Sequence, residues 1–219
     1  MTMSDAIDDA LLARLPQLDT EPAVLGPPAL VRRTARSGDT IAIRSAPAHA
    51  IPEPALIIRN GRQHPQTEWP TSASCQRGDR IVVSVAASVQ ARERYVAWLS
   101  SLALPEGCTL APCSADDGAL HRLWCVAATR LVLPTSVSVE ARHDLLGIRL
   151  GQLALAMGAD TLSGPFAVDR VLPLAGVPRP TESTRDGLAA LVRWAGCKPN
   201  IIADDGSKSA SASAQRPAV

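Results

Sequence analysis

Hydrophobic and polar positions along the chain form patterns that are typical of strands followed by helices. Alternating or continuous apolar runs predict strands over residues 39–44, 55–61 and 80–86. The run at 80–86 is apolar at nearly every position, which is typical of a strand covered on both faces. Ser88 can then cap a helix, so a helix directly follows a strand. This succession predicts an α/β fold.

The clearest helical pattern lies between residues 145 and 158. Four apolar residues are spaced four, three and four apart, and we expect this stripe to be buried: Leu146, Leu150, Leu153 and Met157. Gly158 follows directly, where a helix needs a residue that tolerates a left-handed backbone conformation. Residues 159–164 are short, half apolar and followed by proline, which predicts a brief strand.

Other elements are predicted from the same spacing rules. We expect helices over residues 4–15, 29–36, 88–102, 119–133 and 185–195, and a short strand over 137–140. In these helices Val89 and Leu120 are expected to face inward and Arg92 to face water. Polar and proline-rich composition predicts loops over 17–28, 62–77 and 105–117.

The length and composition indicate one domain with tails. The chain has 219 residues and 46% hydrophobic content, which is enough for one sizeable core. We expect an N-terminal helical segment over residues 1–38 and an α/β domain over 39–203. Residues 204–219 are rich in serine and alanine, so we expect a disordered tail there.

Charge and apolar content set expectations about partners and compartment. A net charge of +1 provides no field that would gather nucleic acid, so no nucleic-acid partner is expected. No apolar run reaches the length of a membrane span, and the N-terminus lacks the pattern of a signal peptide. Five scattered cysteines fit reduced thiols. We therefore expect a cytoplasmic protein, and heavy use of alanine, arginine and valine suggests a bacterial source.

Several short motifs follow one another in a particular order. They are Ala-Thr-Arg-Leu-Val-Leu-Pro at 128–134, Gln-Leu-Ala-Leu-Ala-Met-Gly-Ala-Asp at 152–160, Leu-Ser-Gly at 162–164, Leu-Ala-Gly at 174–176 and Ala-Gly-Cys-Lys-Pro at 195–199. Together they resemble the C-terminal part of radical S-adenosylmethionine enzymes, in the branch of aminofutalosine synthase, dehypoxanthine futalosine cyclase and the deazaflavin synthase subunits. The resemblance covers about a third of the chain and implies a fold derived from a (β/α) barrel.

The sequence departs from this family at its iron–sulfur motif. Those enzymes hold a [4Fe–4S] cluster with three closely spaced thiolates, and no C-x-x-x-C-x-x-C occurs here. The nearest pair, Cys108 and Cys113, has no third thiol close by, and we expect a structural role for it. Only about ninety residues separate the first strand from Arg130, too few for a complete barrel of roughly 250 residues. We therefore expect a partial barrel without a cofactor or metal, which cannot act as an autonomous radical enzyme.

Candidate site residues come from the motifs that carry the resemblance. Arg130, Gln152 and Asp160 are polar residues inside them, and the resemblance implies substrate binding for all three. Asp160 stands where the family usually has asparagine and Thr161 where it has aspartate, which puts the substrate in question. Arg130 has a structural alternative, an ion pair with an acid on the next element. No histidine pair has metal-ligand spacing and no nucleophile motif occurs, so no catalytic residue is assigned.

Three hypotheses for function follow. The first is a degenerate, cluster-less relative with an auxiliary or non-catalytic role, linked to menaquinone (futalosine) or deazaflavin biosynthesis. The second is an enzyme of different chemistry that uses the remnant pocket for a small-molecule ligand. The third is a protein-interaction module, because an incomplete barrel leaves strand edges that a second copy or a protein partner would cover. We therefore expect a homo-oligomer or a bound protein partner.

Overall fold

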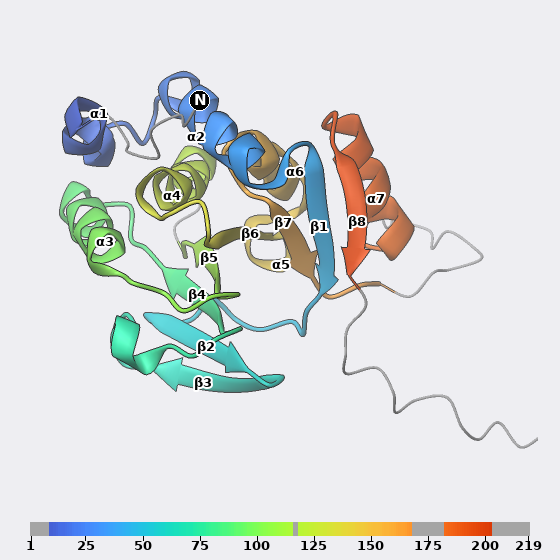
Figure 1. Cartoon of the computed structure of the whole chain (residues 1–219), viewed down its shortest axis with the longest axis horizontal. Coiled ribbons are helices and arrows are strands. Elements are labelled where there is room, and N and C mark those ends of the chain that lie inside the picture. Colours follow the sequence, from blue (N-terminus) through green and yellow to red (C-terminus); the bar gives the residue numbers. More distant parts are fainter. Residues whose placement is uncertain (1–8, 116–117, 168–181, 203–219) are drawn as a thin grey trace, which may run out of the picture.

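The computed structural model describes residues 9–115, 118–167 and 182–202. In these residues, one open eight-stranded sheet has the order β3-β2-β4-β5-β6-β7-β1-β8 (Figure 1). The strands are β1 (Thr40–Ser45), β2 (Ala55–Arg59), β3 (Arg62–Gln66), β4 (Arg80–Ser84), β5 (Thr109–Cys113), β6 (Ser138–Arg142), β7 (Thr161–Gly164) and β8 (Lys198–Ile202). Neighbouring strands from β4 to β8 run parallel, whereas β2 is antiparallel to both β3 and β4. The predicted α/β fold and the open, barrel-like sheet are confirmed.

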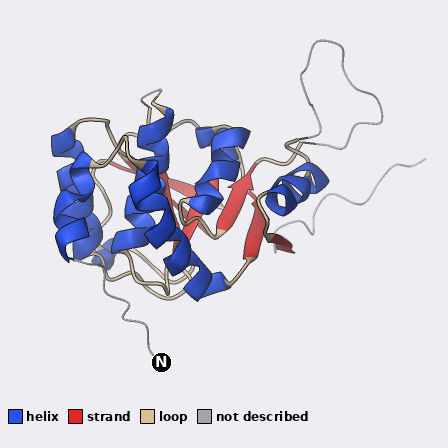
Figure 2. Cartoon of the chain, turned by 90° about the horizontal axis from the view of Figure 1, so that it is seen from above, coloured by secondary structure: helices blue, strands red, loops and turns tan. Residues whose placement is uncertain are grey.

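Helices connect the strands and gather on one side of the sheet, as Figure 2 shows. They are α1 (Asp9–Arg14), η1 (Leu15–Gln17), α2 (Pro22–Ser37), η2 (Ser72–Ser74), α3 (Val89–Ser101), α4 (Ala119–Val132), α5 (His143–Leu146), α6 (Ile148–Ala156) and α7 (Arg185–Trp194). Helix α4 lies in the middle of this layer, in contact with α2, α3 and α6. No helix in the described part of the chain is long and apolar enough to cross a membrane.

The two faces of the sheet differ in polarity. Residues that alternate toward the helices are apolar and fully buried, such as Ile41, Ile81, Leu110 and Val139, and they form the main core with the helices. The opposite face carries a smaller apolar cluster around Leu56 and Val82, and beside it the polar residues described below. Because most of the apolar area is removed from water on the helix side, the other face is left to carry polar groups.

Strand β1 lies between β7 and β8 in the sheet. Ala42 pairs with Thr161 on one side and with Asn200 on the other. In the described part of the N-terminal segment 1–38, α2 packs on the helix layer, where it contacts α4 and α6. The predicted tail, residues 204–219, lies outside the described residues, as do Ser4 and the motif at 174–176.

The long central helix was predicted wrongly. It is two helices, α5 and α6, separated by Gly147, whose φ of 87° interrupts the helical path. Of the expected stripe, Leu146 and Met157 are buried and Leu150 is half-buried, but Leu153 is 54% exposed; α6 buries Ala154 and Leu155 instead. The expected stop is confirmed, because Gly158 has a φ of 99°.

Several loop predictions were also wrong. The regions 62–66 and 109–113 form β3 and β5, and α2 begins at Pro22, inside the region expected to be a loop. Strand β3 has an exposed, polar sequence and is held by backbone pairing with β2 across the Asn60-Gly61 turn.

Single-residue expectations on helix faces failed in three places. Arg92 is buried, because its guanidinium donates to the carbonyls of Pro16 and Ala87 and to Asp19 and so binds the N-terminal segment to α3. Val89 and Leu120 are exposed instead of inward-facing, since both lie in the first turn of their helices.

Candidate functional site

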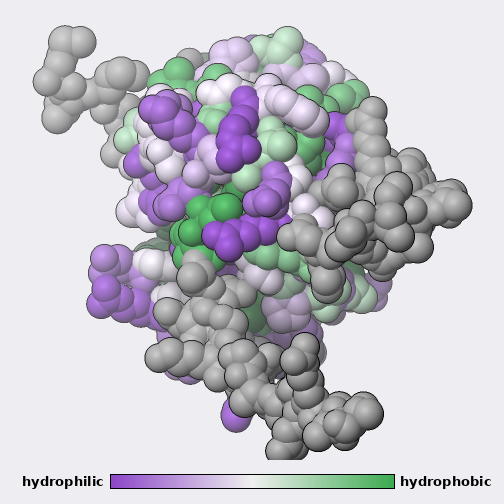
Figure 3. Space-filling model, turned by 90° about the vertical axis from the view of Figure 1, so that its right-hand side faces the viewer, coloured by the Kyte–Doolittle hydropathy of each residue, from purple (hydrophilic) through white to green (hydrophobic). Residues whose placement is uncertain are grey.

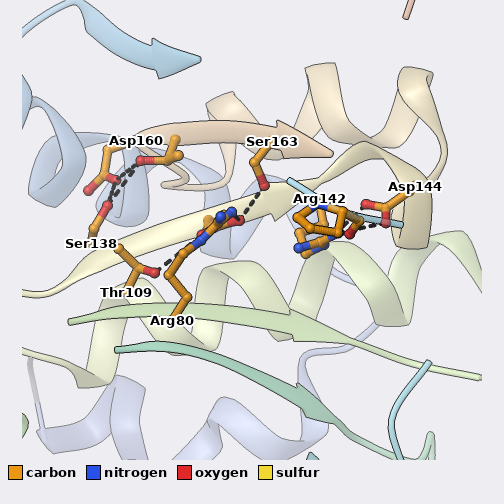
Figure 4. Close-up of polar contacts among 10 residues, drawn as sticks. Arg80, Thr109, Ser138, Arg142, Asp144, Asp160 and Ser163 are labelled. Carbon is orange, nitrogen blue, oxygen red and sulfur yellow. Dashed lines mark hydrogen bonds and ion pairs between the residues drawn. The ribbon is translucent and has the colours of Figure 1, made fainter. Parts of the chain in front are cut away.

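The candidate site is the polar part of the concave face, the side of the sheet away from the helices. Alternate residues of β6 point to this face, namely Ser138, Glu140 and Arg142, and all are buried. Figure 4 shows Ser138 beside Asp160, and Arg142 beside Asp144. The three residues define three levels, from the amino end to the carboxyl end of β6.

The middle level is centred on Glu140, which is 1% exposed. Arg80 on β4 forms a two-bond ion pair with it, and one bond, from Nε to Oε2, is 3.2 Å long. Thr109 Oγ1 donates to Oε2 at 3.2 Å, and Ser163 Oγ donates to Oε1. Burial alone would raise the pKa of Glu140, but the charge and hydrogen bonds of Arg80, with the bond from Ser163, hold that pKa below its ordinary value. Glu140 is therefore a paired carboxylate.

The amino-end level brings together two of the residues predicted from sequence. Arg130 on α4 donates from Nη2 to Asp160 Oδ2 at 2.6 Å, and Arg36 Nε lies 2.8 Å from the same oxygen. Ser138 Oγ donates to Asp160 Oδ1. Arg130 also donates to the carbonyls of Gly158 and Val137, at 2.9 and 3.1 Å. Burial lowers the pKa of Arg130 to about 10, against the opposing effect of Asp160.

This level borders a small cavity on the concave face. The cavity has a volume of about 240 Å³, and its walls come from the end of α2 and from β1, β5, β6, β7 and β8. Strands β5 and β8 are separated by three strands in the sheet, so the sheet must curve for both to line one cavity. Asp160 lines the cavity, whereas the fully buried Arg130 lies behind Asp160. Arg130 does form an ion pair with an acid, but Asp160 directly precedes β7 and is not on the next element, β6. Substrate binding by either residue stays a prediction.

Gln152 is not part of this constellation. It lies on α6 in the helix layer, where its Nε2 donates to the carbonyl of Leu191 on α7 at 3.1 Å. The structure therefore places Gln152 on the other side of the sheet from the concave face.

The carboxyl-end level contains Arg142, which is fully buried. Its Nε and Nη2 donate to Asp144 Oδ1 and Oδ2 at 3.1 and 2.7 Å, and Nη2 also donates to the carbonyl of Pro47 at 2.8 Å. Its third nitrogen, Nη1, is buried and has no hydrogen-bond partner among the described residues. A planar guanidinium with one unused edge is a donor for carboxylate or phosphate oxygens.

Further unused nitrogens lie near this level. Arg44 and Arg142 flank Ser163 in the strand register, and Arg44 Nε is buried without a partner in the described residues. His49 and His143 each have a buried Nε2 that also lacks a hydrogen-bond partner in the described residues. Burial lowers the pKa of both imidazoles and the charge of Arg142 lowers it further, whereas Asp144 acts in the opposite direction. These groups lie at the carboxyl ends of parallel strands, where α/β sheets bind ligands.

The segment 46–54, which follows β1, passes over this part of the concave face. Its Pro47 carbonyl binds Arg142, and Ile51 packs on the apolar cluster around Leu56 and Val82. The electrostatic effect of Arg142, Asp144 and Glu140 on His49 places this histidine near the same level. The segment contains no cysteine.

The cysteines do not fit an iron–sulfur cluster. Cys108 precedes β5 and Cys113 ends it, and their thiols donate to the carbonyls of Gln76 and Val83 respectively. Burial raises the pKa of Cys113 to about 12. In the described ranges, no group of three or more potential metal ligands comes together.

The comparisons with known proteins bear on the family resemblance. No protein-family model matches the chain, and no curated protein is significantly similar to it. The relationship to radical enzymes therefore stays a hypothesis that rests on the order of the short motifs.

The concave face is better suited to binding a charged ligand than to transferring protons. Glu140, Asp160 and Asp144 each form an ion pair with an arginine, so their oxygens are already engaged. Sequence reasoning missed Arg142 and Glu140. The signal was the alternation Ser-Val-Glu-Ala-Arg, which puts charges on one side of a strand that the sheet buries.

Proposed function

We propose that this protein is a cluster-less relative of radical S-adenosylmethionine enzymes that binds a small anionic molecule on its concave face without transforming it. Its role is auxiliary, linked to menaquinone (futalosine) or deazaflavin biosynthesis, and its compartment is the cytoplasm. The motifs between residues 128 and 199 support the relationship, and the concave face supports the binding.

The observation that carries the proposal is the state of Arg142. Its guanidinium is fully buried, and Nη1 has no partner within the described residues, although every carboxylate of the three levels is already paired with arginine. A buried, unsatisfied donor costs about 1–3 kcal/mol, and more when it is charged. An anion at the carboxyl ends of β1, β6 and β7 would satisfy Nη1 and gain from the nearby Arg44.

The absence of radical chemistry is supported by the segment that follows β1. The family resemblance would place the three cluster thiolates there, but residues 46–54 contain none and instead bind Arg142 and cover the apolar cluster. The first test is anaerobic reconstitution with iron and sulfide. We expect no band near ~400 nm and no iron retained after desalting, and about four irons per chain would overturn the proposal.

The second test measures binding directly by isothermal titration calorimetry. The probes are futalosine and dehypoxanthine futalosine, with inosine as a nucleoside that lacks their carboxylate. We expect binding of at least one probe and none of inosine. Arg142→Gln should weaken binding at least tenfold, whereas Arg77→Gln, on an exposed surface pair, should leave it unchanged.

A second variant tests whether a loss of binding is caused by misfolding. His49→Gln changes a half-exposed residue near Arg142, and we expect a smaller loss of affinity with an unchanged melting curve. Equal affinities for the wild type, Arg142→Gln and His49→Gln would show that the probes bind elsewhere and would refute the assignment of the site.

Self-association is the second candidate, because the described sheet is open at β3 and β8. Both edges carry a proline and a cationic residue, Pro65 with Arg62 and Pro199 with Lys198, and these features oppose edge-to-edge pairing. Light scattering at micromolar concentration separates the candidates. A homo-oligomer would support an interaction module, and a 23.0 kDa monomer would exclude self-association.

A further inference from the structure

A second concave region lies on the helix side of the sheet, away from the concave face. It is a groove of about 430 Å³ between α2, α6 and the end of α7. Its walls include Leu30 and Arg33 of α2, Leu153 and Gln152 of α6, and Trp194 of α7. The hydrogen bond from Gln152 to the carbonyl of Leu191 joins α6 to α7 beside the groove. Its volume lies within the range of small-molecule sites.

Arg33 is the unusual residue of this groove. It is 4% exposed, and its Nε and Nη1 are buried with no hydrogen-bond partner in the described residues. The neighbouring arginines of α2 are both engaged: Arg32 donates to the carbonyls of Arg130 and Leu133, and Arg36 pairs with Asp160. The charge of Arg33 contributes to lowering the pKa of Asp39, but the Asp39 carboxylate is already bound by Lys198 at 2.9 Å.

Two buried guanidinium nitrogens without a partner are costly, because they have lost their hydration and gained no hydrogen bond in exchange. Such a group is usually paired or serves a ligand. Since Arg33 lines the groove, an anionic group that enters the groove can reach it. The other walls then decide what kind of molecule carries that anionic group.

Those walls are apolar and exposed to solvent. Trp194 is 71% exposed, Leu153 54% and Leu30 37%, although large apolar residues are usually covered. Figure 3 shows the side of the molecule that carries α7 and β8, where hydrophobic and hydrophilic residues are interspersed. Three exposed apolar side chains around one buried cation match a ligand with an apolar body and one negative group.

We infer that this groove is a binding site for an amphiphilic monocarboxylate. The carboxylate accepts hydrogen bonds from Arg33, and the aromatic or aliphatic body packs between Leu30, Leu153 and Trp194. This site is separate from the concave face, so it stands or falls independently of the proposed function.

The experiment uses 3-phenylpropionate as the probe and 3-phenylpropanol as its neutral counterpart, titrated into the full chain by ligand-observed NMR and calorimetry. For a probe of this size we expect a Kd of roughly 0.1–1 mM. The alcohol should bind at least tenfold more weakly, because it cannot pair with the guanidinium. Equal binding of the acid and the alcohol would overturn the role of Arg33.

Two variants and one control locate the site. Arg33→Met should remove the preference for the acid over the alcohol, and Trp194→Ser should weaken both probes at least threefold. Arg193→Met is the matched control, because Arg193 is an exposed cation next to Trp194, and this variant should bind the acid like the wild type. Since Trp194 is exposed, its substitution keeps the experiment decisive even if Arg33→Met fails to fold.

The other occupant to consider is a second copy of the chain. Light scattering of the wild type and of Trp194→Ser tests this. A dimer that Trp194→Ser dissociates, together with no binding of 3-phenylpropionate, would assign the groove to self-association and overturn the ligand proposal. A monomer that binds the acid and loses it on Trp194→Ser supports the proposal.

Discussion

Gly158→Ala is a substitution for which the structure predicts a large loss of stability. Gly158 follows α6 with a φ of 99°, a conformation that residues with a side chain rarely adopt. A Cβ at this position would lie 2.6 Å from Cγ and 2.7 Å from Cβ of Arg130, and 3.2 Å from Cβ of Ala29. The substitution therefore creates both backbone strain and a collision.

The two costs can be assigned separate magnitudes. The left-handed backbone conformation costs about 1–2 kcal/mol for a residue with a Cβ. The collision involves the first carbons of the Arg130 side chain, which cannot move without displacing the guanidinium from Asp160 and from the Gly158 carbonyl. Disrupting a buried ion pair costs about 3–5 kcal/mol when one partner is left uncompensated. We expect a loss of at least about 3 kcal/mol in the free energy of unfolding.

Gly38→Ala is the matched control. Gly38 also has a positive φ, 60°, but nothing lies within 4 Å of its added Cβ. This variant should lose only the backbone contribution, about 1–3 kcal/mol, because the φ of 60° and ψ of −132° at Gly38 form a conformation that residues with a Cβ rarely adopt. Urea unfolding followed by circular dichroism gives the free energy of unfolding of both variants, and the two values can be compared if the m-value is unchanged. Similar losses in the two variants would show that the packing of Gly158 on Arg130 does not contribute, and the reasoning would fail.

Three further predictions concern other parts of the molecule. Burial depresses the pKa of His143 and His49 below 6.5, so the unfolded chain binds protons more readily than the folded chain. Stability should therefore fall as the pH drops below about 6.5. In the double Gln variant, the midpoint of urea unfolding should depend less on pH between about pH 7 and 5. Leu155→Ala should cost roughly 2–5 kcal/mol and Leu153→Ala under about 1 kcal/mol, because the first side chain is buried and the second exposed; equal losses in thermal melts would contradict the placement of α6. Cys197 should be the first cysteine to react with a thiol reagent in the native state, since the other four are buried; mass spectrometry of the labelled protein identifies the position.

The fold class could be predicted because its strongest signals are local. The apolar run at β4 and the Ser88 cap of α3 depend on residues that are close in sequence, and each prediction has its counterpart in the structure. Strand β3 had no such signal, because its residues are polar and only pairing with β2 makes it a strand. The break at Gly147 was missed because the apolar spacing continues across it.

The candidate site was only partly predictable for a similar reason. Arg130 and Asp160 stand in recognisable motifs, and the chain brings them together through α4 and β7. The roles of Arg142 and Glu140 depend on partners that are far away in the sequence, since Arg80 lies 60 residues before Glu140. A single sequence shows which residues carry charge, but not which of them the sheet buries side by side. Arg33 could not be distinguished by sequence from Arg32, although the two differ completely in their contacts.

The position of β1 between β7 and β8 has a consequence for how the protein is made. Strand β1 ends at Ser45, but neither of its neighbours exists until the ribosome has passed Thr161 and Lys198. At roughly 5–20 residues per second, translation of the intervening segment takes about 6–23 s before β7 starts to emerge. During that interval Ile41 and Ile43 have no strand to pair beside and are open to chaperones and to wrong partners. The sheet can be completed only after β8 has emerged, when β1 enters between two strands that are made later than itself.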